Sequence, residues 1–349
     1  MRKYKDMEII VNFVSYKDKH MPTKNPYSNT MIADLPEPEE IRASEILESF
    51  QKGEIDLICV LGPTASGKTR YAVALARELN RIADINEGKV GAEILSGDSR
   101  QVYRGMDIGT GKDINEYGEI PYHLIDIVDA GTKFDLYQYQ KAFENSYKDI
   151  IDRGGIPILC GGSGLYIEAA TCGYSIPDVP PSQELRDSLE EKSTEELVSM
   201  LASLKPLHNT TDTDTRKRLV RAIEIAVWQK RHPAENTNYL PKKTYYIGTL
   251  VSREERNKRI DARLNARIEE GMADEVRGLL EKGISPENLT YYGLEYKFVT
   301  QYVLGILSID EMKTLLGNAI HQFAKRQMTW FRGMERKGLK IHWTNPDSL

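Results

Sequence analysis

The sequence has no long apolar run, few cysteines and no excess of basic charge, and each absence narrows the choice of function. No stretch approaches the ~18 apolar residues of a membrane span, so we expect no membrane insertion. Only three cysteines occur in 349 residues. Cys59 and Cys160 lie in apolar runs typical of core strands, which predicts reduced thiols and a cytoplasmic protein. The formal net charge of −5 argues against nucleic-acid binding through overall charge, but it allows a local basic face.

Several other signals are missing as well. The six histidines form no metal-ligand cluster, and neither a Ser-His-Asp arrangement nor an internal repeat is present. The apolar piece at residues 9–14 is short, contains Asn12 and lacks a cleavage site, so we predict no signal peptide. The hydrophobic content of 40% and charged content of 28% are typical of a globular protein with one large or two modest domains, and we expect a monomer.

The stretch that is present and organises the chain is LICVLGPTASGKT at residues 57–69. Its apolar start predicts a buried strand, and the rest fits the phosphate-loop pattern of Gly, four residues, Gly-Lys-Thr. Glycines let backbone N–H groups curl around an anion, and the helix that follows adds its positive dipole end. The predicted phosphate site consists of Gly62, Pro63, Thr64, Ala65, Ser66, Gly67, Lys68 and Thr69, with the Thr69 hydroxyl suited to Mg²⁺. The loop alone leaves kinase, ATPase and diphosphate-substrate transferase open.

Strand and helix patterns alternate after this loop, which predicts an α/β fold: a P-loop core whose parallel sheet is flanked by helices. We divide the chain into an N-terminal extension and linker (1–54), the P-loop core (55–175), an inserted helical domain (176–243) and a continuation of the core with the C-terminal helices (244–345). Within the extension, residues 9–14 suit a strand and 41–53 an amphipathic helix. Residues 121–128 suit another short strand, and 320–343 a tail helix.

Two loops have ambiguous roles. Asp98 emerges from the carboxyl end of the expected strand at 92–96, the edge where open α/β sheets gather ligands. An equally good interpretation is that Asp98 or Ser99 caps a short helix. The GGSG turn at 161–164 is either a second anion-facing loop or a tight strand-to-helix connection, and the pattern favours the connection.

Basic residues gather in several helical segments. Arg263 belongs to a set of arginines at helical spacing, which either share one face or form salt bridges within their helix. The tail segment interleaves basic residues with Phe323, Trp330 and Phe331, a composition suited to RNA contact or to docking against the core.

Five blocks in one order resemble the tRNA dimethylallyltransferase family, also called tRNA isopentenyltransferases. They are GPTASGKT (62–69), SGDSRQVYRGMDIGTGKD (96–113), GGSGLYI (161–167), TDTRKRLVRAIEI (213–225) and AKRQMTWFR (324–332). The resemblance extends from about Ile55 to Trp343. A phosphate loop is common to many families, whereas its combination with the second and fifth blocks is far more specific.

The resemblance implies transfer of the dimethylallyl group of dimethylallyl diphosphate to N6 of adenosine 37, next to the anticodon, in tRNAs that read codons beginning with U. It implies that the phosphate loop holds the diphosphate, that Mg²⁺ assists, and that Arg263 contacts the diphosphate. Asp98 matches the aspartate that orients and deprotonates the amine, and Thr64 and Ser163 match residues that line the same channel.

The same carry-over assigns tRNA contacts to four segments. They comprise Asp98, Ser99, Arg100 and Gln101; Lys217, Arg218 and Arg221; Tyr296 and Lys297; and Lys325, Arg326, Gln327, Trp330 and Arg332. Two departures fall on this side: Glu295 stands where the family usually has glycine, and His321 where arginine is common. The choice of tRNAs is therefore less well determined than the chemistry.

Three rival functions remain at this point. One is a P-loop kinase or ATPase acting on a small substrate, and another is a non-catalytic RNA-binding module. The third is a prenyltransferase of free adenine nucleotides, against which the Lys/Arg/Trp tail argues.

Overall fold

The structure, a computed structural model, describes residues 36–83, 91–207, 211–232 and 239–349. All described helices and strands belong to one compact unit, Glu37–Leu349. The strand predicted at 9–14 lies outside the described residues. Among those described, no helix is long and apolar enough to cross a membrane.

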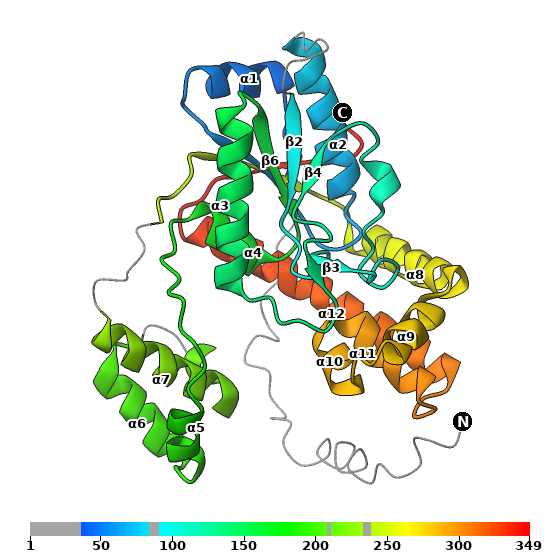
Figure 1. Ribbon diagram of the computed structural model, residues 1–349. Helices are drawn as coiled ribbons and strands as arrows, with labels where there is room; N and C mark the ends of the chain where they lie inside the picture. Colours follow the sequence, from blue (N-terminus) through cyan, green and yellow to red (C-terminus); the bar gives the residue numbers. More distant parts are fainter. Residues whose placement is uncertain (1–35, 84–90, 208–210, 233–238) are drawn as a thin grey trace. The chain divides into compact units, whose positions relative to one another are not determined.

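A six-stranded sheet in the order β4-β2-β6-β1-β7-β8 forms the centre of this unit, and each neighbouring pair is parallel (Figure 1). The strands are β1 (Leu57–Leu61), β2 (Ala92–Ser96), β4 (Tyr122–His123), β6 (Ile156–Gly161), β7 (Thr244–Thr249) and β8 (Ile341–Thr344), and a separate pair is formed by β3 (Tyr103–Arg104) and β5 (Val128–Asp129). The predicted α/β fold with a parallel sheet is confirmed.

The register of the sheet brings three loops together at one edge. Leu61 at the end of β1 pairs with Gly161 of β6, and Ser96 at the end of β2 pairs with Cys160. The phosphate loop, the loop after β2 and the GGSG turn therefore leave the sheet side by side. This is the edge at which ligands bind in open α/β sheets.

Helices cover both faces of the sheet because the central strands are apolar on both sides. The helices are α1 (Ala43–Gln51), α2 (Lys68–Ile82), α3 (Leu136–Asp152), α4 (Gly164–Thr171), α5 (Gln183–Glu190), α6 (Thr194–Leu204), α7 (Arg216–Arg231), α8 (Arg253–Glu270), α9 (Met272–Glu281), α10 (Pro286–Tyr291), α11 (Leu294–Val303) and α12 (Ile309–Arg336). Leu57 and Cys59 of β1 pack with α3, α4 and α12, whereas Ile58 and Val60 pack with α1 and α2 on the opposite face. Cys59 is a free thiol, as expected.

Residues 37–54 belong to this core, although the sequence suggested an extension. The predicted helix is present as α1, and its Ile46 and Leu47 are buried against the same cluster as α2. The Glu39 N–H donates to the carbonyl of Trp343 at 2.6 Å, which joins this segment to β8. The apolar face of an amphipathic helix packs against another apolar surface, and for α1 that surface is one face of the sheet.

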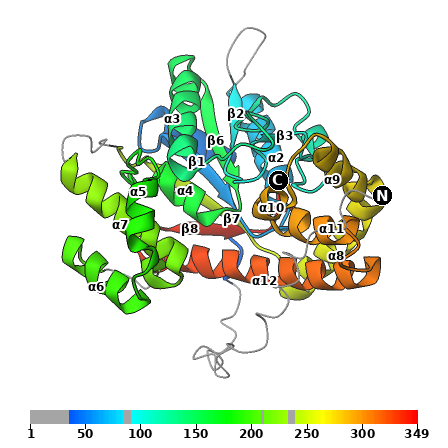
Figure 2. The same ribbon diagram turned by 60° about the horizontal axis from the view of Figure 1, so that its bottom comes forward.

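Two other expectations are corrected. The tail helix ends at Arg336, well before residue 343, because Gly338 turns the chain at a φ of +93° and the apolar residues Ile341 and Trp343 enter the sheet as β8. The strand expected at 121–128 is split into β4 and β5, since Leu124 and Asp126 adopt positive φ values. In Figure 2, α12 runs alongside β8 and then beneath α10 and α11.

Between α4 and β7, the described residues form the helices α5, α6 and α7. They bury a small core of their own, formed by Leu189, Leu197, Leu201, Leu219 and Ile223. The predicted break at Gly271 separates α8 from α9, with a φ of +108° that favours glycine.

Candidate active site

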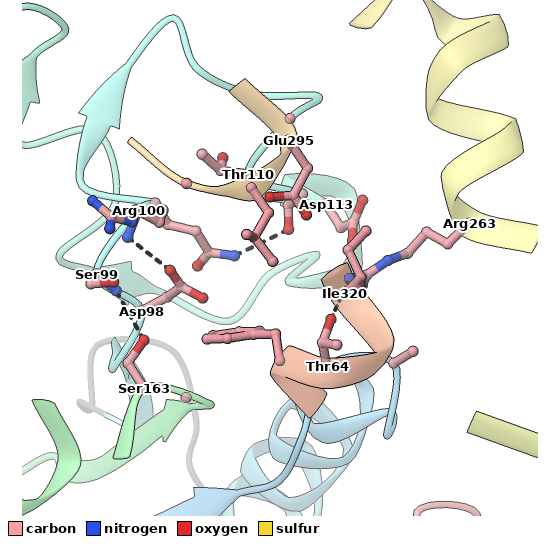
Figure 3. A pocket seen from close by; sticks show the side chains of 18 of the residues that line it. Thr64, Asp98, Ser99, Arg100, Thr110, Asp113, Ser163, Arg263, Glu295 and Ile320 are labelled. Carbon is pink, nitrogen blue, oxygen red and sulfur yellow. Dashed lines mark hydrogen bonds between the residues drawn. The ribbon is translucent and has the colours of Figure 1, made fainter. Parts of the chain in front are cut away.

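A cavity of about 860 Å³ opens where the loops after β1, β2 and β6 meet (Figure 3). Residues of α8, α11 and α12 complete its wall. This volume is typical of sites for small molecules and cofactors. The cavity therefore joins the predicted phosphate loop to the loop that carries Asp98.

The phosphate loop presents only part of its length to this cavity. Gly67 adopts a φ of +79° just before α2 begins, so that the first unpaired N–H groups of the helix face the cavity. Ser66 is fully buried, and its hydroxyl lies 2.6 Å from the hydroxyl of Thr249. Of the eight predicted residues, Thr64, Ala65, Gly67, Lys68 and Thr69 line the cavity, whereas Gly62, Pro63 and Ser66 are buried beneath it.

Three cations gather in this region: Lys68 and Arg263 are half-buried, and Arg267 is buried. Burial, and next the charge of Arg267, lowers the pKa of Arg263 to about 10. Burial also lowers the pKa of Lys68, and the nearby Arg263 adds to this shift. The Nη2 atom of Arg267 is buried without a hydrogen-bond partner and lies 3.6 Å from Asp113. A bound anion would relieve all three groups, so the electrostatics favour a phosphate or diphosphate.

Thr64 connects the two sides of this cationic region. Its hydroxyl accepts a hydrogen bond from Nη2 of Arg263 at 2.7 Å, and its N–H donates to Oε1 of Gln327 at 2.8 Å. The Nε2 of Gln327 in turn donates to the carbonyl of Gly162 at 2.8 Å. A Cβ atom at Gly162 would lie 2.6 Å from that nitrogen, which explains the glycine. Gln327, predicted from the resemblance to contact tRNA, is buried and positions the phosphate loop.

Asp98 lies on the opposite wall. Its Oδ1 accepts from the Arg100 N–H at 2.8 Å, which uses one carboxylate oxygen for a local turn. No helix begins between β2 and β3 in this described stretch, so the helix-cap reading is not supported. The Ser163 hydroxyl accepts from the Ser99 N–H at 3.4 Å. Figure 3 shows Asp98, Ser99 and Ser163 on one side, and Thr64 and Arg263 across from them.

Comparison with known proteins gives the family. A family model described as "IPP transferase" matches residues 101–334. A tRNA dimethylallyltransferase 1 of Porphyromonas gingivalis is 55% identical over 291 residues, which cover 82% of this chain and 93% of that protein.

The chain belongs to the IPP transferase family. A tRNA dimethylallyltransferase 2 of Bacteroides fragilis is 52% identical over 296 residues, covering 84% of this chain and 93% of that protein. The crystal structure of a tRNA isopentenylpyrophosphate transferase from Bacillus halodurans matches with a TM-score of 0.58 and 31% identity, over 83% of this chain and 89% of that one. The resemblance found in the five sequence blocks is thereby confirmed, and the fold agrees.

Several residues expected on the tRNA side of this IPP transferase meet at the cavity. Ser99, Arg100, Gln101, Lys297 and Arg326 line it together with Asp98. The Arg100 guanidinium lies 5.5 Å from the ring centre of Tyr291, and that of Arg326 lies 5.8 Å from the ring of Phe323. Cationic and aromatic groups thus alternate around the opening.

Other expected tRNA contacts lie elsewhere. Lys325 and Trp330 are exposed on α12, and Trp330 packs so closely on Gly164 that a Cβ there would lie 2.2 Å from its ring. Arg332 follows on the same helix. Lys217, Arg218 and Arg221 lie on α7, outside the cavity lining. Arg218 pairs with Asp214 at 3.1 Å, and Arg221 donates to the Val179 carbonyl at 2.7 Å, so both have structural partners.

Tyr296, another expected tRNA contact, also lines the cavity. Its side chain is buried, and its hydroxyl donates to Oε1 of Glu275 at 2.6 Å, so it also supports the wall. The lining also includes residues that the sequence reasoning did not assign: Arg70, Asp113, Glu116, Tyr291 and Asp347. Asp113 ends the GTGKD block, and this motif could have indicated a site residue. Asp347 lies in the C-terminal tail, where no sequence motif indicates one.

Glu295, the departure from the family pattern, also lines the cavity. Burial raises the pKa of its carboxyl group, and attraction by Arg267 and Arg263 offsets only part of this effect. A carboxyl group whose pKa is higher in the folded state does not destabilise the fold at pH values below its ordinary pKa in the unfolded chain, because it is then protonated in both states. Its destabilising effect is complete at pH values above the folded-state pKa. Glu295 therefore destabilises the fold increasingly as the pH rises through this window.

We expect Glu295→Gln to raise the melting temperature by ~1–3 °C at pH 8, with a gain that shrinks towards pH 5. Thermal unfolding followed by circular dichroism at both pH values measures this difference. Glu281→Gln, which removes an exposed carboxylate at the end of α9, is the matched control and should show little change. An increase in melting temperature of equal size at both pH values would contradict a raised pKa of Glu295.

Proposed function

We propose that this protein transfers the dimethylallyl group of dimethylallyl diphosphate to N6 of adenosine 37 in tRNAs that read codons beginning with U. The products are N6-(dimethylallyl)adenosine and diphosphate. The observation that carries the proposal is a single cavity in which the Asp98 carboxylate faces a phosphate loop and the half-buried cations Lys68 and Arg263. The names of the related proteins support the same activity.

The reaction forms a bond between N6 and C1 of the prenyl group and breaks the bond between C1 and the diphosphate oxygen. The electron pair of the broken bond leaves with diphosphate, where Lys68, the amides of the phosphate loop and Arg263 stabilise the added charge. The proton of N6 passes to Asp98. The amine is a weak nucleophile because its lone pair is delocalised into the ring, and a positioned base compensates for this. Thr64 and Ser163 line the channel between the two sides.

Mg²⁺ fits the donor side. The Thr69 hydroxyl is a hard oxygen ligand at the start of α2, and the described residues contain no cluster of three or more carboxylate, histidine or cysteine ligands for a metal. Such a site suits an ion held chiefly by waters and substrate phosphates, as Mg²⁺ commonly is. When bound, Mg²⁺ would neutralise charge on the diphosphate.

The acceptor is a tRNA anticodon loop. An adenine must leave its stack to reach Asp98, and exposed aromatic rings beside guanidinium groups stabilise unstacked bases and neighbouring phosphates. Tyr291 with Arg100, and Phe323 with Arg326, provide such pairs at the opening. An enzyme acting on free nucleotides would need no such rim.

We expect tRNA incubated with the protein, Mg²⁺ and dimethylallyl diphosphate to yield N6-(dimethylallyl)adenosine, detected by mass analysis of its nucleosides. Reactions without the donor are the control, and parallel reactions contain AMP or ATP in place of tRNA. Prenylated AMP with unmodified tRNA would favour the nucleotide prenyltransferase. Steady ATP hydrolysis without prenyl transfer would favour the kinase or ATPase.

A further inference from the structure

A single carboxylate on α9 receives four hydrogen bonds from groups around the loop after β3. Oε2 of Glu275 accepts from the N–H groups of Asp107 at 2.7 Å and Ile108 at 2.8 Å. Oε1 accepts from the Gly109 N–H at 3.1 Å and from the Tyr296 hydroxyl at 2.6 Å. Three successive amides that converge on one anion form a nest, and hydrogen bonds to a charged acceptor are stronger than neutral ones.

The loop held in this way forms part of the cavity wall. Gly109, Thr110, Gly111 and Asp113 line the cavity, and Thr110 and Asp113 lie beside Glu295 in Figure 3. A Cβ atom at Gly109 would lie 2.7 Å from the Tyr296 ring, so the loop packs directly on the residue that shares Glu275. The position of the loop thus depends on α9 and α11.

Hydrogen bonds lead from this loop to the backbone of Asp98. The Gly111 N–H donates to the Asp107 carbonyl at 2.9 Å, and the Gly111 carbonyl accepts from Nε2 of Gln101 at 3.1 Å. Oε1 of Gln101 accepts from the Ser96 hydroxyl at 3.0 Å, which itself accepts from the Asp98 N–H at 3.3 Å. Gln101, expected to touch tRNA, therefore also connects the loop to the base.

From this chain of contacts we infer that Glu275 is a positioning residue for prenyl transfer, acting on Asp98 through the 107–111 loop. The inference depends on the proposed function, since it assigns Asp98 as the base. Glu275 itself stays outside the cavity lining and touches no substrate. A displacement of about 1 Å in a reacting group lowers rates by ~10²-fold, so the loop needs a firm anchor.

The test is a double-mutant cycle of Glu275→Gln with Asp98→Asn. The introduced amide keeps the shape of the Glu275 side chain and one acceptor oxygen, but it turns an NH₂ group towards the N–H donors on the other side, so at least one of the three backbone bonds is lost. We expect single-turnover transfer to tRNA to fall by ~10–100-fold in the parent background and by less than ~3-fold in the Asp98→Asn background. A residue that merely supports the fold would lower both rates by the same factor.

Asp274→Asn is the matched control. It removes a neighbouring carboxylate of α9 that is exposed and pairs with Arg277, not with the loop. Hydrogen exchange supplies a readout independent of activity: among the amides of Asp107, Ile108 and Gly109, at least one should lose protection in Glu275→Gln, and all three should keep it in Asp274→Asn. Equal losses in both backgrounds of the cycle, or unchanged protection, would overturn the inference.

Failure of the proposed function and failure of a variant to fold can each be distinguished from failure of the inference. If the parent protein transfers no prenyl group, the proposed function fails, while the exchange experiment still tests whether Glu275 holds the loop. If Glu275→Gln does not fold, Tyr296→Phe removes one of the four bonds and leaves the nest intact. We expect it to slow transfer by ~2–5-fold in the parent background alone. An unchanged rate would count against the inference.

Discussion

Asp98→Asn is expected to slow single-turnover prenyl transfer by ~10²–10⁴-fold, the usual span for a positioned acid–base group. Asparagine keeps the size of the side chain and an oxygen that can accept from the Arg100 N–H, so the local turn should survive. What it loses is the negative charge and the basicity needed to take the N6 proton. The measurement is transfer to tRNA at saturating dimethylallyl diphosphate and excess enzyme.

The loss should appear in the rate and not in the affinity for either substrate, because the interaction is made mainly in the transition state. Binding of inorganic diphosphate, which depends on the opposite wall of the cavity, should stay within ~2-fold of the parent. Asp129→Asn, an exposed carboxylate paired with Arg104, is the control for the charge change. A near-parental rate in Asp98→Asn would leave the mechanism without its base.

Lys68→Ala is expected to lower transfer by on the order of 10²–10³-fold while tRNA binding stays close to that of the parent. Lys68 lines the cavity as part of the phosphate loop, and in the proposed reaction its charge acts on the leaving diphosphate. Burial lowers its pKa, so the folded protein holds this cation at a cost until an anion arrives.

That cost leads to a second, structural expectation for the same variant. Lys68→Ala should unfold at a temperature equal to or above that of the parent, because an undercompensated buried charge has been removed. Inorganic diphosphate with Mg²⁺ should raise the melting temperature of the parent and have little effect on the variant, since binding to the native state stabilises it. Lys282→Ala, an exposed lysine after α9, is the control. Equal stabilisation of Lys68→Ala and the parent by diphosphate would remove Lys68 from the donor site.

The sequence predicted the parts of this site that are formed by residues adjacent in the chain. The phosphate loop follows a buried strand and precedes a helix, and both its geometry and its anion preference arise from its own backbone. The position of Asp98 at the ligand edge was predicted because it follows a strand, and strand ends of a parallel sheet meet at one edge; its role as a base was implied only by the family resemblance. Helical periodicity likewise placed α8, α9 and their break at Gly271.

Contacts between segments far apart in the chain could not be predicted from the sequence. Thr64 and Gln327 are 263 residues apart, and Thr64 and Arg263 are 199 apart, yet the Thr64 N–H donates to Gln327 while its hydroxyl accepts from Arg263. Gln327 and Tyr296 were expected to contact tRNA because of the family resemblance; in the fold both side chains are buried at the cavity wall and hydrogen-bonded to distant segments. Residue type and spacing describe what a side chain can do, whereas its partner depends on how the helices pack on the sheet.

The sequence by itself thus predicted the phosphate loop, placed Asp98 at a strand end and indicated the family. Only the tertiary structure decided which phosphate-loop residues face the cavity, that residues 341–344 return to the sheet, and that Glu275 anchors the loop beside Asp98. The physical reason is that local hydrogen bonds and periodicity act over a few residues. The register of the sheet and the packing of α9, α11 and α12 are set by many weak contacts between segments far apart in the chain.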